Sequence, residues 1–147
     1  HWEETAEDST ETRGFFIEDD GGFQKPMEFW IGAMTFTPDA KILITGSRDN
    51  TIRFFEMPTM NELRVLRGHN GWVRSLTVSP DGKVLISSGD DNTIRFWDIA
   101  TGRNFRTDKT HTGPVRGVAL SPDGLRLASA SWDRTVKLWE GGQEPAE

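Results

Sequence analysis

The chain has 147 residues, contains no cysteine and carries a formal net charge of -6 at pH 7. The lack of cysteine excludes disulfides and cysteine-based zinc or iron–sulfur sites. No apolar run reaches the roughly 18–20 residues of a membrane-spanning helix, and the length is sufficient for one domain with a hydrophobic core.

The acidic side chains are concentrated at the amino terminus. Residues 1–24 hold eight acidic side chains but only one basic side chain, Arg13, whereas the remaining sequence is nearly neutral. Because this segment has too few apolar side chains to offset the entropy lost on ordering, we expect a largely disordered acidic leader. An alternative is a tail that docks on an arginine-bearing surface of this protein or of a partner.

The sequence from about residue 30 to residue 140 repeats three times with a period of 42 residues. The repeated positions include three Pro-Asp pairs (38–39, 80–81 and 122–123), three aspartates (Asp49, Asp91 and Asp133) and three aromatic residues (Phe55, Trp97 and Trp139). A period of this length with short strands indicates a propeller array, because a single repeat cannot bury its own faces and must stack on its neighbours.

The middle repeat predicts four antiparallel strands. We expect strands over residues 72–78, 84–87, 93–98 and 104–107, separated by turns at 79–82, 91–92 and 100–102. Within the first strand, the spacing between apolar residues changes from three (Val73 to Leu76) to two (Leu76 to Val78). This change predicts a β-bulge near Arg74 and Ser75.

Together with Gly68-His69 and Thr110-His111, which mark the same phase of the period, the aligned units resemble WD40 repeats. The resemblance implies an all-β fold: a partial WD40 β-propeller of three four-stranded antiparallel blades, whose ring this chain alone does not close. The expected blades are a degenerate one over residues 25–71, one over 72–113, and one over 114–141 that lacks a clear outer strand, followed by a tail over 142–147.

Both complete units carry histidine, serine, aspartate and tryptophan at matching positions, which in WD40 repeats resemble a buried hydrogen-bonded relay that locks the blade. The implied relay residues are His69, Ser87, Asp91 and Trp97 in the middle blade and His111, Ser129, Asp133 and Trp139 in the last. A Ser-His-Asp set also suggests a hydrolase, but its recurrence at the repeat period favours a structural role, so we expect no enzyme. We expect no metal site either, because the two histidines belong to different blades and no carboxylate cluster joins them.

The first repeat departs from this pattern. Met27 stands where the histidine is expected, Phe55 replaces the tryptophan and Ala40 replaces the turn glycine. Thr45 and Asp49 remain, but without their relay partners. We therefore expect this blade to be the least stable of the three.

WD40 blades present one rim to partners, and the resemblance assigns residues of this sequence to it. The implied partner-binding residues are Trp30, Arg48, Trp72, Arg74, Asp90, Arg116 and Trp132, with Gly32 and Pro114 at the remaining rim positions. Tryptophan and arginine are enriched in interface hot spots, and we expect Arg74 and Arg116 to face solvent. An alternative is that Trp30 and Trp72 pack into loops between blades.

The resemblance implies a non-catalytic protein–protein interaction scaffold that needs no cofactor. Arginine and tryptophan suit acidic or phosphorylated peptides, because guanidinium groups pair with carboxylates and phosphates. Nucleic acid is not expected as a partner, since the repeats lack a basic stripe, and neither is a membrane. The alternative function is an architectural subunit, or a fragment of a larger propeller, buried permanently in a multiprotein complex.

Three blades cannot close a ring, which leaves two sheet faces and a strand edge open. The missing blades either lie elsewhere in a longer parent sequence, come from another subunit, or come from a second copy of this chain. Residues 14–25 are candidates for an added outer strand, since WD40 rings often borrow a strand from one terminus.

Overall fold

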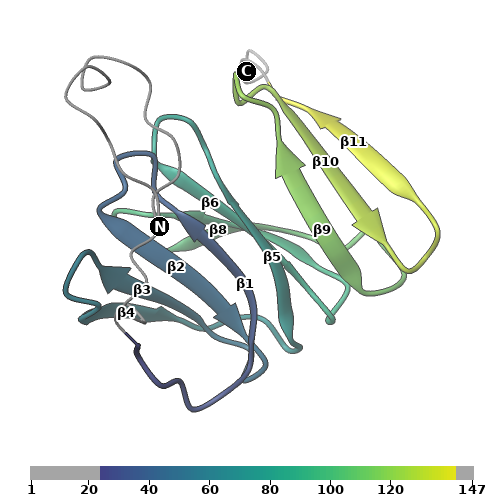
Figure 1. Cartoon of the computed structure of the whole chain (residues 1–147). Helices are drawn as coiled ribbons and strands as arrows, with labels where there is room; N and C mark the ends of the chain where they lie inside the picture. The colour runs from purple at the N-terminus through teal and green to yellow at the C-terminus, as the bar shows by residue number, and fades with distance from the viewer. Residues whose placement is uncertain (1–23, 142–147) are drawn as a thin grey trace, which may run out of the picture.

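The computed structural model describes residues 24–141, in which eleven strands form three antiparallel sheets (Figure 1). Within each sheet, strands that follow one another in the sequence are neighbours. Blade 1 contains β1 (Ile31–Phe36), β2 (Ile42–Ser47), β3 (Ile52–Glu56) and β4 (Glu62–Leu66). Blade 2 contains β5 (Val73–Val78), β6 (Val84–Gly89), β7 (Ile94–Asp98) and β8 (Asn104–Asp108). Blade 3 contains β9 (Val115–Leu120), β10 (Arg126–Ser131) and β11 (Val136–Glu140).

These stacked sheets confirm the expected fold class. Blades 1 and 2 have the expected four strands, whereas blade 3 has three in the described part of the chain. The sequence after β11 begins with two glycines, which are poor strand formers because they lose the most entropy on ordering. Most of the expected leader and the whole tail lie outside the described residues. Residues 24–141 contain no helix long and apolar enough to cross a membrane.

A β-bulge recurs in the first strand of each blade. The bulge predicted in blade 2 is confirmed, because the pairing of β5 with β6 shifts register between Val73 and Ser75. Equivalent shifts occur at Gly32 in blade 1 and at Arg116 in blade 3. Since bulges re-aim side chains, Arg74 and Arg116 stand where the regular alternation of side chains along the strand is interrupted.

The turn between the first two strands of each blade requires a residue with positive φ. Gly82 (φ 75°) and Gly124 (φ 76°) adopt this conformation without strain, because glycine has no Cβ. In blade 1 the same position is occupied by Ala40, with a φ of 62°. A residue with a Cβ loses about 1–2 kcal/mol in this region, so the irregular sequence of the first repeat carries a conformational cost.

Blades 1 and 2 pack through a continuous apolar core, which we call junction 1–2. The buried cluster consists of Ile44, Ile52, Phe54 and Leu66 from blade 1 and Val73, Leu76, Leu85 and Trp97 from blade 2. The two sheets approach closely at Gly46, where an added Cβ would lie 2.4 Å from Val73 Cγ1. Glycine at this position therefore permits the tight contact between the blades.

Blades 2 and 3 pack through a smaller core and two serine hydroxyls, at junction 2–3. The buried cluster consists of Ile86 and Ile94 from blade 2 and Val115 and Leu127 from blade 3. Ser88 Oγ donates to the Val115 carbonyl oxygen at 3.0 Å, and Ser75 Oγ accepts from the Val118 amide at 3.0 Å. Both apolar packing and hydrogen bonds therefore join blade 3 to blade 2.

An apolar cleft of about 450 Å³ remains at junction 2–3, lined in part by Phe96, Phe105 and Trp139. At junction 1–2, the corresponding place is occupied by Ile99, which packs against the buried cluster. Forty-two residues after Ile99 the chain has Gly141. The absence of that aliphatic side chain is one cause of the cleft.

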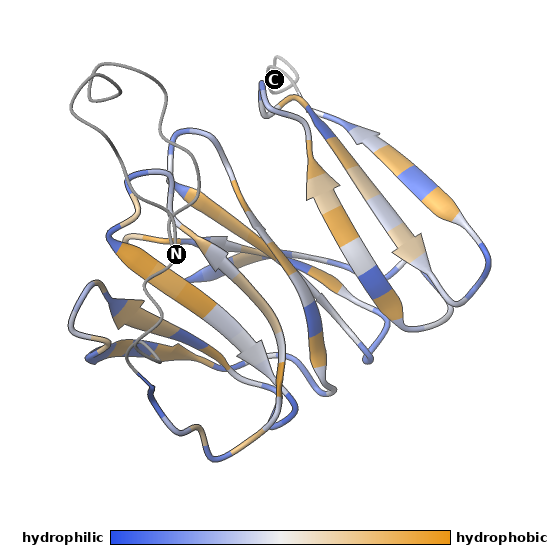
Figure 2. Cartoon of the chain, viewed as in Figure 1, coloured by the Kyte–Doolittle hydropathy of each residue, from blue (hydrophilic) through white to orange (hydrophobic). Residues whose placement is uncertain are grey.

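The two outward faces of the array expose apolar side chains. Met34 and Phe36 on β1 are 62% and 54% exposed, and Val136 and Leu138 on β11 are 74% and 64% exposed. Figure 2 shows how apolar and polar residues alternate along β11. The repeat equivalents of these four exposed residues all pack at a blade junction: Leu76 and Val78 correspond to Met34 and Phe36, and Ile94 and Phe96 correspond to Val136 and Leu138. Each outward face is thus a junction surface without a neighbouring blade in the described chain.

Candidate functional site

The structure brings together all four residues of the expected relay in blade 2. His69 Nδ1 lies 2.9 Å from Asp91 Oδ2, and His69 Nε2 lies 2.7 Å from Ser87 Oγ. Because a carboxylate only accepts, Nδ1 carries the proton and Nε2 accepts from the Ser87 hydroxyl. Trp97 Nε1 donates to the same hydroxyl oxygen at 2.8 Å. The relay therefore links β6, β7 and two loops of one blade.

Asp91 accepts further hydrogen bonds, from the Asn70 amide at 2.9 Å, the Thr93 amide at 3.1 Å and Thr93 Oγ1 at 2.8 Å. Burial raises the pKa of Asp91, but the hydrogen bond and electrostatic attraction of His69 lower it. Hydrogen bonds from Asn70 and Thr93 lower it further, and together these interactions have the larger effect. They hold the pKa of Asp91 well below its ordinary value. The carboxylate is consequently charged at neutral pH.

Blade 3 repeats the arrangement. His111 Nδ1 lies 2.7 Å from Asp133 Oδ2, His111 Nε2 lies 2.8 Å from Ser129 Oγ, and Trp139 Nε1 donates to Ser129 Oγ at 3.3 Å. Thr135 Oγ1 also donates to Asp133, at 2.6 Å. The threonine was missed in the sequence, although its recurrence as Thr51, Thr93 and Thr135 at the repeat period is a signal that could have identified it.

Blade 1 lacks this connected set. Thr45 Oγ1 is buried without a hydrogen-bond partner, and Phe55 and Met27 line a cavity of about 190 Å³ instead of forming a relay. Asp49 accepts from Thr51 Oγ1 at 2.7 Å and pairs with Arg53 at 3.0 Å. Burial raises the pKa of Asp49, but hydrogen bonds from neighbouring side chains lower it by more. These partners all lie within a few residues of Asp49, so they do not tie distant parts of the blade together.

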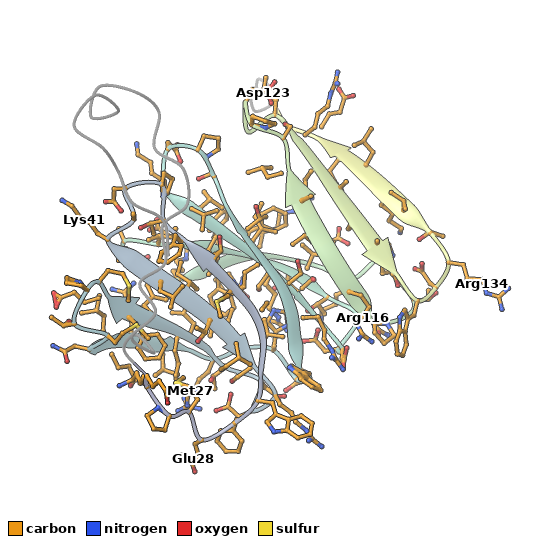
Figure 3. The ribbon with its side chains drawn as sticks, in the orientation of Figure 1. Met27, Glu28, Lys41, Arg116, Asp123 and Arg134 are labelled. Atoms are coloured by element: carbon orange, nitrogen blue, oxygen red, sulfur yellow. The ribbon has the colours of Figure 1, made fainter. Side chains whose placement is uncertain are left out.

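The seven expected partner-binding residues, which we call the rim, lie where the first strands of the blades begin. The same end carries Arg116 in Figure 3, while Lys41 and Asp123 lie at the opposite end. One backbone hydrogen bond of 2.9 Å recurs in all three blades: the amides of Arg48, Asp90 and Trp132 donate to the carbonyl oxygens of Trp30, Trp72 and Pro114, respectively. Rim residues distant in sequence are thus paired within each blade.

Blades 1 and 2 contribute a stack of indole and guanidinium groups to the rim. Arg48 Cζ lies 5.1 Å from the ring centroid of Trp30 and 5.7 Å from that of Trp72. Arg74 Cζ lies 3.6 Å from the ring centroid of Trp72. Since cation–π contacts are attractive, the four side chains hold one another in position.

Arg74 is also bound to a carboxylate. Its Nε and Nη2 atoms donate to Asp90 Oδ1 and Oδ2 at 3.0 Å and 2.9 Å, a bidentate ion pair. The expectation that Arg74 faces solvent is therefore wrong, because the guanidinium lies against both Trp72 and Asp90. Arg48 and Arg116 make no ion pair with any residue in the described part of the chain.

The two tryptophans of the stack differ in burial. Trp30 is 67% exposed, whereas Trp72 is half-buried. An added Cβ on Gly32 would lie 2.4 Å from Trp72 Nε1, so the indole rests in space that only glycine leaves open. The alternative of packing between blades therefore applies to Trp72 and not to Trp30.

Blade 3 carries a further arginine–tryptophan pair. Arg116 Cζ lies 4.2 Å from the ring centroid of Trp132, and Trp132 is 67% exposed. The residue types are those of Arg48 and Trp30 on blade 1, although the arginine lies closer to the indole here and Trp132 stands at the repeat position of Arg48. The rim thus ends on both sides in an exposed indole that contacts an arginine.

A comparison with protein families agrees with the repeated blades and relays. The family model described as WD domain, G-beta repeat matches residues 25–56, 60–98 and 102–140. This chain belongs to the WD40 family. WD40 repeats are in general protein-interaction scaffolds and are typically not catalytic.

The WD40 relays have the connectivity of a hydrolytic triad but not its accessibility. Ser87 and Ser129 are 0% and 1% exposed, and a tryptophan N–H already occupies each hydroxyl oxygen. A nucleophile must reach a substrate atom, which neither serine can do while its blade is folded. Nor does any group of three or more histidine, aspartate or glutamate side chains in residues 24–141 have an arrangement that could hold a metal ion.

Proposed function

We propose that this WD40 chain is a non-catalytic scaffold that binds proteins through its rim, with Arg48 and Arg116 pairing with acidic or phosphorylated side chains. One observation carries the proposal. Two exposed indoles, Trp30 and Trp132, each contact an arginine that has no carboxylate partner among residues 24–141.

The rigidity of the rim favours binding. Trp72 is wedged over Gly32, and Arg74 is fixed by Trp72 and Asp90, so these side chains lose little further freedom when a partner docks. Such preorganisation lowers the entropic cost of association. The exposed tryptophans add apolar area, while the unpaired arginines add charge recognition.

The proposal is tested by selecting peptides from displayed random and phosphorylated libraries on the immobilised chain. Wild type is expected to enrich acidic or phosphorylated peptides, and the double variant Arg48→Glu/Arg116→Glu is expected to bind them at least about tenfold more weakly. Lys41→Glu/Arg103→Glu makes the same charge change at the opposite end of the blades. If both double variants bind the selected peptides equally well, the rim is not the binding site.

The outward faces favour a second candidate function, that of an architectural subunit. Met34 and Phe36 at one side, and Val136 and Leu138 at the other, are the exposed equivalents of residues that pack at the junctions. The partner of these faces would be further blades, whether from a parent chain, another subunit or a second copy. Self-association of the chain separates this function from transient binding at the rim.

A further inference from the structure

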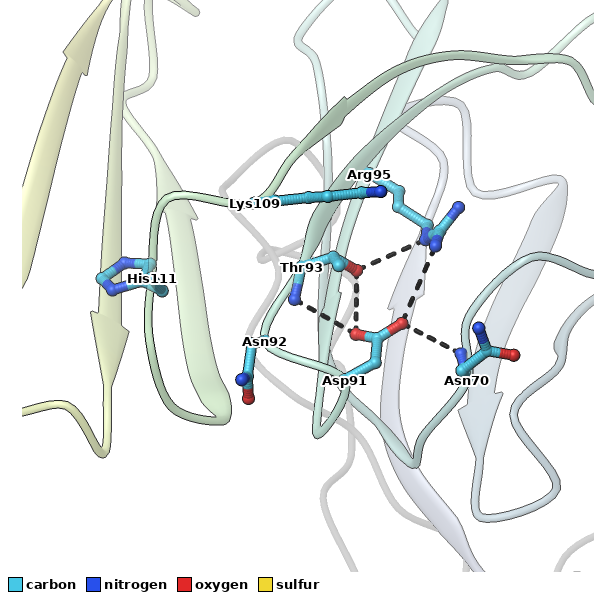
Figure 4. Close-up of a pocket in the computed structure, with 7 residues that line it drawn as sticks. All are labelled: Asn70, Asp91, Asn92, Thr93, Arg95, Lys109 and His111. Atoms are coloured by element: carbon cyan, nitrogen blue, oxygen red, sulfur yellow. Dashed lines mark hydrogen bonds and ion pairs between the residues drawn. The ribbon is translucent and has the colours of Figure 1, made fainter.

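A polar pocket of about 370 Å³ lies at junction 2–3 and shares no residue with the rim (Figure 4). Its lining residues are Asn70, Asp91, Asn92, Thr93, Arg95, Lys109 and His111. Figure 4 shows Lys109 extending from the connection between β8 and β9 toward Arg95, with Asn70 and Asn92 on either side of Asp91. Two cations and two side-chain amides therefore surround one space.

Positive charge exceeds negative charge in this pocket. Asp91 is the one carboxylate in its lining, and both of its oxygens already accept hydrogen bonds within blade 2. Arg95 Nη2 is 3.9 Å from Asp91 Oδ2, and Arg95 Nη1 donates to the neutral amide oxygen of Asn104 at 3.2 Å. The Lys109 ammonium has no hydrogen bond or ion pair with the residues that the structure describes.

The repeat-equivalent arginine in blade 1 is neutralised from within the chain. Arg53 lies 3.0 Å from Asp49 Oδ2 and 3.4 Å from Glu62 Oε1. Forty-two residues later, Asn104 replaces Glu62. Arg95 has therefore lost the second carboxylate that its counterpart holds.

A second carboxylate is replaced in the same way. Glu28 in blade 1 corresponds to Asn70 in blade 2, while the cation at the position of Lys109 is kept as Arg67. The blade 1 set has three carboxylates for two cations, whereas the blade 2 set has one carboxylate for two cations. Both carboxylates are replaced by amides: Asn70 lines the pocket and can donate hydrogen bonds there, whereas Asn104 Nδ2 already donates to the carbonyl oxygens of Phe96 and Arg106.

We propose that this pocket binds an anionic side chain of a partner protein, either a carboxylate or a phosphorylated residue, between Lys109 and Arg95. The anion replaces the charge that Glu62 supplies to Arg53 in blade 1. The amides of Asn70 and Asn92 donate hydrogen bonds to its oxygens. Charge-assisted hydrogen bonds of this kind are stronger than neutral ones, so the site adds a specific acidic contact beyond the rim.

Protection of Lys109 from an amine-reactive reagent, quantified by mass spectrometry, tests the proposal on the full chain in any oligomeric state. The probes are N-acetyl-O-phosphoserine methylamide, N-acetylglutamate methylamide and uncharged N-acetylserine methylamide, at constant ionic strength. An anionic probe at two-thirds occupancy is expected to slow labelling of Lys109 roughly threefold. Lys41 and Lys83, which lie in turns at the other end of the blades, are the internal controls.

Three variants complete the test. Asn70→Glu restores the carboxylate of Glu28 and is expected to abolish protection, as is Arg95→Gln, whereas Arg67→Gln is expected to leave protection unchanged. Protection by phosphoserine alone or by glutamate alone identifies the anion and supports the site. Equal protection of all lysines, protection by the uncharged probe, or no protection of Lys109 overturns it. Because no rim residue is altered, failure here is separate from failure of the rim proposal.

Discussion

Ser87 Oγ lies 2.7 Å from His69 Nε2, with its hydroxyl enclosed inside blade 2. The same oxygen accepts from Trp97, so one small side chain satisfies partners from two other segments. At the equivalent place in blade 1, the Thr45 hydroxyl is equally enclosed but has no partner. We therefore expect these two residues, at one structural position, to contribute differently to stability.

Removing these two hydroxyl groups should therefore give different results. Ser87→Ala leaves His69 Nε2 and Trp97 Nε1 without a buried partner and should lower the unfolding free energy by about 1–3 kcal/mol. Thr45→Val removes an unsatisfied group of similar shape and should be neutral or stabilising. Denaturant unfolding measures both, and a larger loss for Thr45→Val than for Ser87→Ala would contradict the relay.

The two turn aspartates provide a second comparison. Asp91→Ala should cost about 1–3 kcal/mol, because it strands the buried His69 ring and the donors of Asn70 and Thr93. Asp49→Ala should cost clearly less, since its partners are local and include no histidine. Equal losses in denaturant unfolding would refute the distinction between blades 1 and 2.

Stability should decrease in acid. The pKa of Asp91 in the folded protein lies below the ordinary value of 3.8, so its contribution is fully present above that value and is lost as the pH falls below about 4. Asp49 and Asp133 have pKa values shifted in the same direction. Chemical unfolding between pH 6 and pH 3 checks this, with Asp91→Asn as the variant expected to flatten the dependence; an unchanged slope would remove Asp91 as a cause.

The first turn of blade 1 can be improved. Ala40→Gly should raise the unfolding free energy by up to about 1 kcal/mol, because relief of the left-handed strain exceeds the entropy that glycine adds to the unfolded chain. Gly82→Ala is the matched control and should be destabilising at the equivalent position. Thermal unfolding of both variants measures the two changes in stability. Destabilisation by Ala40→Gly would contradict the inference that Ala40 is strained at its positive φ.

The isolated chain should not behave as a compact monomer. Its outward faces expose apolar junction residues on both sides, and contiguous exposed apolar surface of this kind marks interaction or aggregation sites on soluble proteins. Sedimentation at micromolar concentration should show dimers or larger species, which Val136→Lys/Leu138→Lys should reduce. Leu63→Lys, at an exposed position on β4, is the control. A stable wild-type monomer would contradict the prediction that the outward faces need a partner.

The period of 42 residues predicted the stacked blades, and the changed spacing of Val73, Leu76 and Val78 predicted the bulge near Arg74, because both depend on local spacing. The relay residues came from the resemblance to WD40 repeats. The side chain of Arg74 was harder to predict. A flexible arginine side chain can pair with any of several nearby groups, and the spacing of the repeats does not indicate that Arg74 pairs with Asp90. The pocket beside Arg95 was missed for a related reason, since it depends on two acids that became amides between repeats.

The polar contacts between blades also affect how the array responds to temperature. At junction 1–2, Arg64 donates to the carbonyl oxygens of Ile99 and Ala100 at 2.9 Å and 3.1 Å, and at junction 2–3 the hydroxyls of Ser75 and Ser88 also hydrogen-bond across the blades. Apolar association weakens on cooling, whereas these hydrogen bonds do not depend on apolar burial. We therefore expect both junctions to keep a polar connection in the cold, when their apolar clusters contribute less.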